Sequence, residues 1–144
     1  MFKNITVAFV TRKVKTKSFM VGMAMAQKFN GNLTIIECVL KRTPKFVLFE
    51  TKDDKKAAKK QKLTGEKTLK EFEAKAKSAN ISVKTVLALT ESVPDWIHDY
   101  TKKHRTDLLI IDHPHLTDFE ESYYDDIIKT ISHEVSVPLL LLRS

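Results

Sequence analysis

The feature that most constrains the fold is a regular alternation of short apolar runs with longer helical stretches. The runs expected as strands are residues 3–10, 32–40, 82–89, 107–111 and 137–143. They are rich in β-branched and aliphatic residues, and several are apolar on both faces. Such strands, alternating with helices, form a parallel sheet that is covered on both sides. Because parallel crossovers are right-handed, the sequence predicts a five-stranded, doubly wound, Rossmann-like α/β sheet.

Four helices are expected between these strands, over residues 18–30, 53–79, 92–104 and 124–135. The third has the clearest start, because Ser92 is a good N-cap and Pro94 falls in the first turn. The fourth is expected to begin near Tyr124, after a loop over residues 112–122. No repeat or interdomain linker interrupts the pattern, so residues 1–144 are expected to form a single domain.

The net charge of +7 raises the question of a nucleic-acid partner. The charge is polarised: residues 41–84 hold fourteen lysines and arginines against six acidic residues, and residues 107–144 hold two against eight. The lysine-rich helix lacks interleaved aromatic residues and any base-reading motif, so nucleic acid is not the expected partner. No apolar run approaches the roughly 20 residues that span a bilayer, so no membrane partner is expected either.

The cysteine content and the first residues bear on the compartment. Cys38 is the single cysteine, so no internal disulfide can form, and its place in a strand predicts a buried thiol. Residues 1–5 are too few and too polar for a signal peptide. We therefore expect a cytoplasmic protein.

A ligand site in a doubly wound sheet lies beyond the carboxyl ends of the strands, where the strand order reverses. With the first strand in the centre, this point lies between the first and fourth strands, at the loops over residues 10–16 and 112–126. The candidate residues of this crevice are Val10, Thr11, Arg12, Asp112, His113, His115, Asp125 and Asp126.

The two ends of the chain resemble the universal stress protein family. The opening FKNITVAFV is similar to the family's FKNILVAVDGS, and DLLIID…VPLLLLR is similar to its DLIVMG…CPVLLVR. The resemblance covers essentially the whole chain. It implies a sheet of strand order 3-2-1-4-5, a non-enzymatic role in survival under stress, and, in many members, dimerisation through the last strand.

The same resemblance implies a nucleotide site that is degenerate here. Nucleotide-binding members carry an Asp at the end of the first strand and a loop G-x-x-G-x₉-G-[S/T] after the fourth. The Asp position is Val10 in this chain, and the loop positions fall on Asp112, His115, Asp125 and Asp126. Glycines in such a loop let the backbone approach a phosphate, and none is present between residues 112 and 126.

Charge adds to this steric argument. Asp125 and Asp126 are expected at the start of the last helix, where they would satisfy the helix dipole in place of a phosphate. A carboxylate about 4 Å from a phosphate costs roughly 1–4 kcal/mol, unless a bridging Mg²⁺ reverses the sign. The sequence therefore predicts no tight ATP binding by the family mode, and no cofactor.

The Asp/His cluster leaves two interpretations open. Asp112, His113, His115, Asp118, Asp125 and Asp126 carry ligand-type groups that could hold a divalent metal. Alternatively, these carboxylates pair with Arg12, Lys13, Lys15 and Lys17 across the crevice. No H-E-x-x-H or comparable spacing is present, so the ion-paired loop is preferred and no metal is expected.

The last strand is short and very apolar, which favours a homodimer. The candidate dimer residues are Val137, Leu139, Leu140, Leu141 and Leu142. An edge strand of this kind needs cover, and pairing with its twin would provide it.

The preferred function is a non-enzymatic, non-ATP-binding stress-response or interaction domain that acts as a homodimer, with a possible protein partner. No nucleophile elbow, P-loop or C-x-x-C is present, so no catalytic residue is expected. The alternatives are a small-ligand or metal sensor that uses the crevice, a stress protein that binds ATP or AMP, and an enzyme of the wider nucleotide α-hydrolase class.

Overall fold

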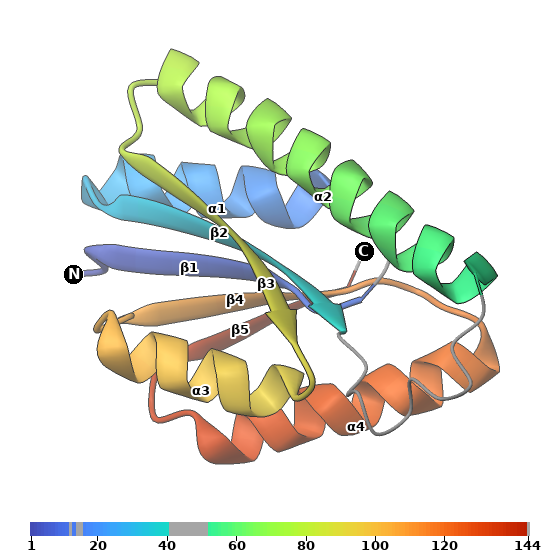
Figure 1. Cartoon of the computed structure of the whole chain (residues 1–144). Helices are drawn as coiled ribbons and strands as arrows, with labels where there is room; N and C mark the ends of the chain where they lie inside the picture. Colours follow the sequence, from blue (N-terminus) through green and yellow to red (C-terminus); the bar gives the residue numbers. More distant parts are fainter. Residues whose placement is uncertain (12, 14–15, 41–51, 144) are drawn as a thin grey trace.

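A five-stranded parallel sheet with helices on both faces makes up the structure, a computed structural model (Figure 1). The structure describes residues 1–11, 13, 16–40 and 52–143. The strands are β1 (Asn4–Phe9), β2 (Asn32–Leu40), β3 (Val83–Thr90), β4 (Leu108–His113) and β5 (Leu139–Arg143). The helices are α1 (Thr16–Phe29), α2 (Lys52–Ser78), α3 (Val93–Lys103) and α4 (Asp118–Glu134).

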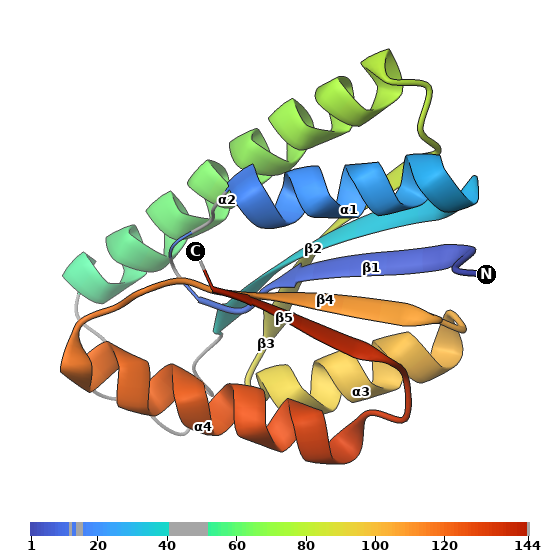
Figure 2. The ribbon, with the colours of Figure 1, turned by 180° about the vertical axis from the view of Figure 1, so that it is seen from behind.

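The strand order is β3-β2-β1-β4-β5, and every neighbouring pair is parallel. Helices α1 and α2 lie on one face of the sheet, and α3 and α4 lie on the other (Figures 1 and 2). The predicted fold class and strand order are confirmed. The order reverses between β1 and β4, which puts the expected crevice at the carboxyl ends of these two strands.

Helix α3 begins as predicted, because Ser92 is its N-cap and accepts a hydrogen bond from the backbone N–H of Asp95 at 3.5 Å. The prediction for α4 was wrong. This helix starts at Asp118, with Thr117 as N-cap, and not at Tyr124. Residues 118–134 contain neither glycine nor proline, so nothing in the backbone stops the helix from extending back to Thr117.

Two other boundaries differ from the predictions. β5 begins at Leu139, so Val137 lies before the strand, partly buried against the core on the α3/α4 side. The proline that separates them cannot donate to the sheet, which explains the later start. The extended piece considered for residues 46–49 lies outside the described residues.

One layer of core fills each face of the sheet. On the α1/α2 face, Phe72 of α2 stacks on Phe19 of α1, with ring centroids 4.2 Å apart, and on Phe9 of β1 at 5.9 Å. On the other face, Ile36, Ile97 and their neighbours pack under α3 and α4. Within the described ranges, none of the helices is both long and apolar enough to cross a bilayer.

Two acidic side chains are buried on the strands next to Phe9, one on each side of it. Phe9 of β1 pairs in register with Glu37 of β2 on one side and with Asp112 of β4 on the other. Residues paired in this way point to the same face of a sheet, here the face under α1 and α2. The apolar core on that face therefore ends, near the carboxyl edge, in a row with two carboxyl groups.

Glu37 packs closely under α2 at Gly65. A Cβ atom at Gly65 would lie 3.0 Å from the Glu37 carboxyl carbon, so a larger residue there would require the Glu37 side chain to shift by a few tenths of an ångström. Glu37 is only 6% exposed, and its Oε2 atom has no hydrogen-bond partner among the described residues. Burial raises the pKa of the Glu37 carboxyl above its ordinary value of 4.5.

Cys38 follows Glu37 in β2 and is buried, as predicted. Burial, and then the neighbouring charge of Glu37, raises the pKa of the Cys38 thiol to about 12. The thiol is therefore protonated at neutral pH and serves as a small apolar side chain.

Glu37→Gln tests this buried carboxyl. The folded chain holds the Glu37 proton above pH 4.5, whereas the unfolded chain releases it, so this residue's contribution to stability is lost as the pH rises through the raised pKa. The glutamine side chain cannot ionise. The free energy of unfolding of the variant, minus that of the natural protein, should therefore increase as the pH rises. Urea denaturation followed by circular dichroism between pH 4 and pH 8 measures the difference.

The matched control is Glu66→Gln, which changes an exposed carboxyl on α2 beside Gly65. Its free energy of unfolding should track that of the natural protein over the whole pH range. A difference between Glu37→Gln and the natural protein that stays constant with pH would show that folding does not raise the pKa of Glu37.

Candidate functional site

The crevice between β1 and β4 is built from the residues that follow these two strands and from the first turns of α4. Val10 and Thr11 follow β1, Asp112 and His113 end β4, and α4 begins five residues after His113. The topology therefore brings both predicted loops together, as the strand order requires. Arg12, which was included among the crevice residues, lies outside the described residues.

At the end of β1, neither described side chain is available to a ligand. Val10 is only 3% exposed and packs into the core under α3 and α4. Thr11 is buried too, and its hydroxyl is engaged with the backbone of Lys13: Oγ1 donates to the carbonyl oxygen at 3.1 Å and accepts from the N–H at 3.2 Å. These local bonds shape the turn after β1.

Asp112 is a buried structural carboxylate. Its side chain is 1% exposed and accepts a hydrogen bond from the hydroxyl of Ser18, which is itself fully buried in the first turn of α1. The bond joins the end of β4 to the start of α1 across the crevice. A negative charge also suits this place because a helix N-terminus carries partial positive charge.

The most concentrated polar contacts join β4, α4 and β5. His113 Nε2 lies 2.8 Å from Asp125 Oδ1, and one guanidinium nitrogen of Arg143 lies 3.1 Å from the same ring nitrogen. The other guanidinium nitrogen donates to Glu121 Oε1 at 3.1 Å. We call His113, Glu121, Asp125 and Arg143 the crevice network. It links β4, α4 and β5 at this end of the sheet.

The network bears on the ion pairs expected from the sequence. Among the described residues, Asp125 pairs with His113 and not with Lys13 or Lys17; Arg12, another expected partner, lies outside those residues. Lys17 instead donates to the backbone carbonyl of Arg143 at 3.3 Å, and Lys15 lies outside the described residues. Glu121 was not among the residues predicted from the sequence. The spacing of Glu121 and Asp125, four residues apart, signals a shared helix face only once α4 is known to include both.

Asp125 and Asp126 do not stand at the start of the last helix, so the predicted dipole contact was wrong. They lie about two turns into α4, which begins at Asp118. Asp126 is exposed, and His115 is exposed in the loop between β4 and α4. Among the predicted crevice residues that the structure describes, His113 and Asp125 are thus in direct contact.

A divalent metal would find three ligand-type groups in the crevice network. One ligand atom from each of His113, Glu121 and Asp125 lies within 4.8 Å of the other two. Arg143, however, contacts both His113 and Glu121 and supplies the positive charge that these groups would otherwise take from a cation. The donor set therefore suits a metal only if Arg143 moves away.

Comparison with known proteins agrees with this architecture. The model of the universal stress protein family matches residues 1–143. Solved structures that are similar include the universal stress protein UspA from Lactobacillus plantarum, at 15% identity and a TM-score of 0.78, covering 99% of this chain and 98% of that one. Another is a universal stress protein family member from Burkholderia pseudomallei, at 12% identity and a TM-score of 0.74, covering 99% and 97%.

A third similar structure is a universal stress protein from Archaeoglobus fulgidus in complex with dAMP, at 11% identity and a TM-score of 0.62, covering 98% of each chain. No curated protein gives a significant match to the chain. The family match spans all but the last residue, and the strand order of the sheet is the one that the family resemblance implied. The chain belongs to the universal stress protein family.

Proposed function

We propose that this chain is a universal stress protein that works without ATP, as a non-enzymatic interaction domain in the stress response. The observation that carries the proposal is the early start of α4. In the family pattern, an open glycine loop follows the fourth strand; in this chain, the corresponding residues 118–126 belong to a continuous helix.

Two backbone donors near the start of α4, those of Glu120 and Glu121, are already engaged. The N–H of Glu121 donates to the carbonyl oxygen of Thr117 at 2.7 Å, and the N–H of Glu120 donates to the Thr117 hydroxyl at 3.4 Å. A phosphate loop works by leaving successive N–H groups free to point at the anion. Donors that are engaged in a helical turn and its cap cannot do so without unwinding that turn.

The charges of the crevice also oppose the binding of a phosphate. Glu120, Glu121, Asp125 and Asp126 all lie in the first half of α4, and Arg143, which reaches this helix from β5, is engaged by Glu121. An incoming phosphate would meet a surplus of carboxylates. At about 1.4 kcal/mol for each power of ten, even two unfavourable contacts lower its affinity by several powers of ten.

No catalytic role belongs to the proposal. Ser18 and Asp112 are the hydroxyl and carboxylate in direct contact at this edge of the sheet, and both are buried away from any substrate. Nucleophilic catalysis needs a hydroxyl that a substrate can reach and a base beside it. The single, buried Cys38 adds no reactive thiol and is compatible with a reducing compartment, so we assign the function to the cytoplasm.

ATP titration tests the proposal directly. We expect the purified chain to show no saturable heat in isothermal titration calorimetry with ATP and Mg²⁺ up to about 1 mM nucleotide, since the helical turn and its carboxylates oppose the phosphates. A family member that binds a nucleotide serves as the positive control. A dissociation constant in the micromolar range would contradict the proposal.

We propose that the chain acts as a homodimer through β5. This strand forms one edge of the sheet, in the foreground of Figure 2, and pairs with β4 alone. Its residues Leu139, Leu140 and Leu142 are partly exposed, and Leu141 is 44% exposed. An apolar edge with unpaired backbone groups favours pairing with a second copy, which would cover the leucines and extend the sheet.

Leu141→Lys should shift the chain from dimer to monomer without unfolding it, because a lysine at a two-fold edge contact brings two like charges together. The matched control is Leu89→Lys on β3, the opposite edge, because Leu89 is also 44% exposed. Sedimentation velocity at several concentrations measures the mass. A natural protein that is monomeric, or a Leu141→Lys variant that stays dimeric, would refute dimerisation through β5.

A divalent-cation sensor is the second candidate, favoured by the three ligand-type groups of the crevice network. Arg143 stands against it, so we expect ZnCl₂ to leave the melting temperature unchanged in a thermal-shift assay. A rise in melting temperature with ZnCl₂ that disappears in His113→Ala would favour the sensor. His115→Ala, which changes an exposed imidazole in the same loop, is the control.

A further inference from the structure

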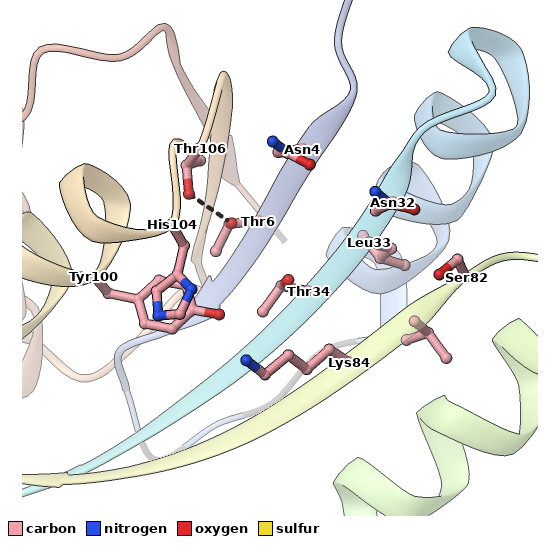
Figure 3. Close-up of a pocket in the computed structure, with 11 residues that line it drawn as sticks. Asn4, Thr6, Asn32, Leu33, Thr34, Ser82, Lys84, Tyr100, His104 and Thr106 are labelled. Atoms are coloured by element: carbon pink, nitrogen blue, oxygen red, sulfur yellow. Dashed lines mark hydrogen bonds between the residues drawn. The ribbon is translucent and has the colours of Figure 1, made fainter.

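A pocket opens at the opposite end of the sheet from the crevice. It has a volume of about 290 Å³ and lies beside α3, at the amino-terminal ends of β1, β2 and β3 (Figure 3). Its lining is mostly polar and includes Asn4, Thr6, Thr34, Lys84, Tyr100 and His104. This volume lies near the small end of the range for ligand pockets.

The floor of this pocket is a polar row in a face that is otherwise core. Thr6 of β1 pairs in register with Thr34 of β2, which pairs with Lys84 of β3. The next row toward the carboxyl ends is apolar: Ala8 and Ile36 are fully buried, and Val86 is partly buried. This row carries threonine and lysine in place of aliphatic side chains. Part of the sheet is therefore uncovered there and presents polar groups.

One wall of the pocket is a stack of rings on α3 and its C-cap. The ring of Tyr100 lies parallel to that of Trp96, with centroids 5.1 Å apart, and to that of His104 at 4.1 Å. Tyr100 is largely buried and His104 is exposed, so the stack runs from the core to the mouth of the pocket. Figure 3 shows both rings on the α3 side and Lys84 across from them.

Several donors of this pocket are not used by the protein. The Thr6 and Thr106 hydroxyls bond to each other at 3.1 Å. In contrast, the part of the chain that the structure describes offers no hydrogen bond or ion pair to the Lys84 ammonium, the Tyr100 hydroxyl or the His104 ring. Cationic and neutral donors that converge on one cavity favour an oxyanion as their common partner.

We propose that this pocket binds a small sugar phosphate. The Lys84 ammonium and the His104 ring hold the phosphate, and the hydroxyl of Thr34 and the amide of Asn32 contact the sugar hydroxyls, since both line the same cavity. The site is independent of the crevice and of the ATP-free function proposed above.

Nitrogen-15 NMR of the full chain, titrated with glucose 6-phosphate, tests the proposal. We expect saturable amide shifts in residues 32–34, 82–84 and 100–106, with residues 112–126 unchanged. Glucose and inorganic phosphate, titrated separately, should each bind at least about tenfold more weakly, because each lacks half of the contacts. The absence of shifts up to about 10 mM glucose 6-phosphate, or shifts confined to residues 112–126, would overturn the proposal.

Lys84→Ala should weaken glucose 6-phosphate binding about tenfold, which corresponds to the loss of one charge-assisted contact. Lys102→Ala removes an exposed lysine of α3 that does not line the pocket, so it controls for net charge. Equal weakening by both variants would mean that the ligand responds to overall charge and not to this pocket. Retained thermal stability of Lys84→Ala shows that the variant is folded.

Discussion

The character of the crevice depends on a backbone constraint at the start of α4. A helix propagates wherever side chains permit helical dihedral angles and a cap satisfies its first N–H groups. Thr117 provides that cap, and residues 118–134 contain no glycine or proline to open the chain. The N–H of Glu121 therefore bonds to Thr117, and the segment that follows β4 becomes a rigid, acidic helix. The crevice network then forms because this helix presents Glu121 and Asp125 toward β4 and β5.

The sequence predicted the fold well because the fold depends on repeated apolar patterns. It missed the first turns of α4 for the same reason: Phe119 is 87% exposed and Tyr123 is exposed as well, so these turns bury no regular stripe. The contact of His113 with Asp125 lay within the predicted cluster, but the roles of Glu121 and Arg143 depend on three elements meeting in space. Contacts between residues that are far apart in the chain cannot be predicted from the hydrophobic pattern of the sequence.

The two ends of the sheet differ in how their polar groups are used. At the carboxyl ends, Asp112 accepts a hydrogen bond from Ser18, and the side chains of the crevice network contact one another. At the amino ends, Lys84 and His104 face an open cavity. Glu37 is a third case: its carboxyl group is buried beneath Gly65, away from both the crevice and the pocket. Each polar residue in this fold has to be judged by its partners.

The most direct test of the account is where α4 begins in solution. Backbone NMR assignment, with ¹³Cα secondary shifts and amide hydrogen exchange, reports helical structure residue by residue. The account predicts continuous helical shifts from Asp118 and a slowed exchange rate for the Glu121 amide, which bonds to Thr117. Random-coil shifts over residues 118–123, with helical shifts starting only at Tyr124, would mean that the loop is open and that its N–H groups are available to a phosphate.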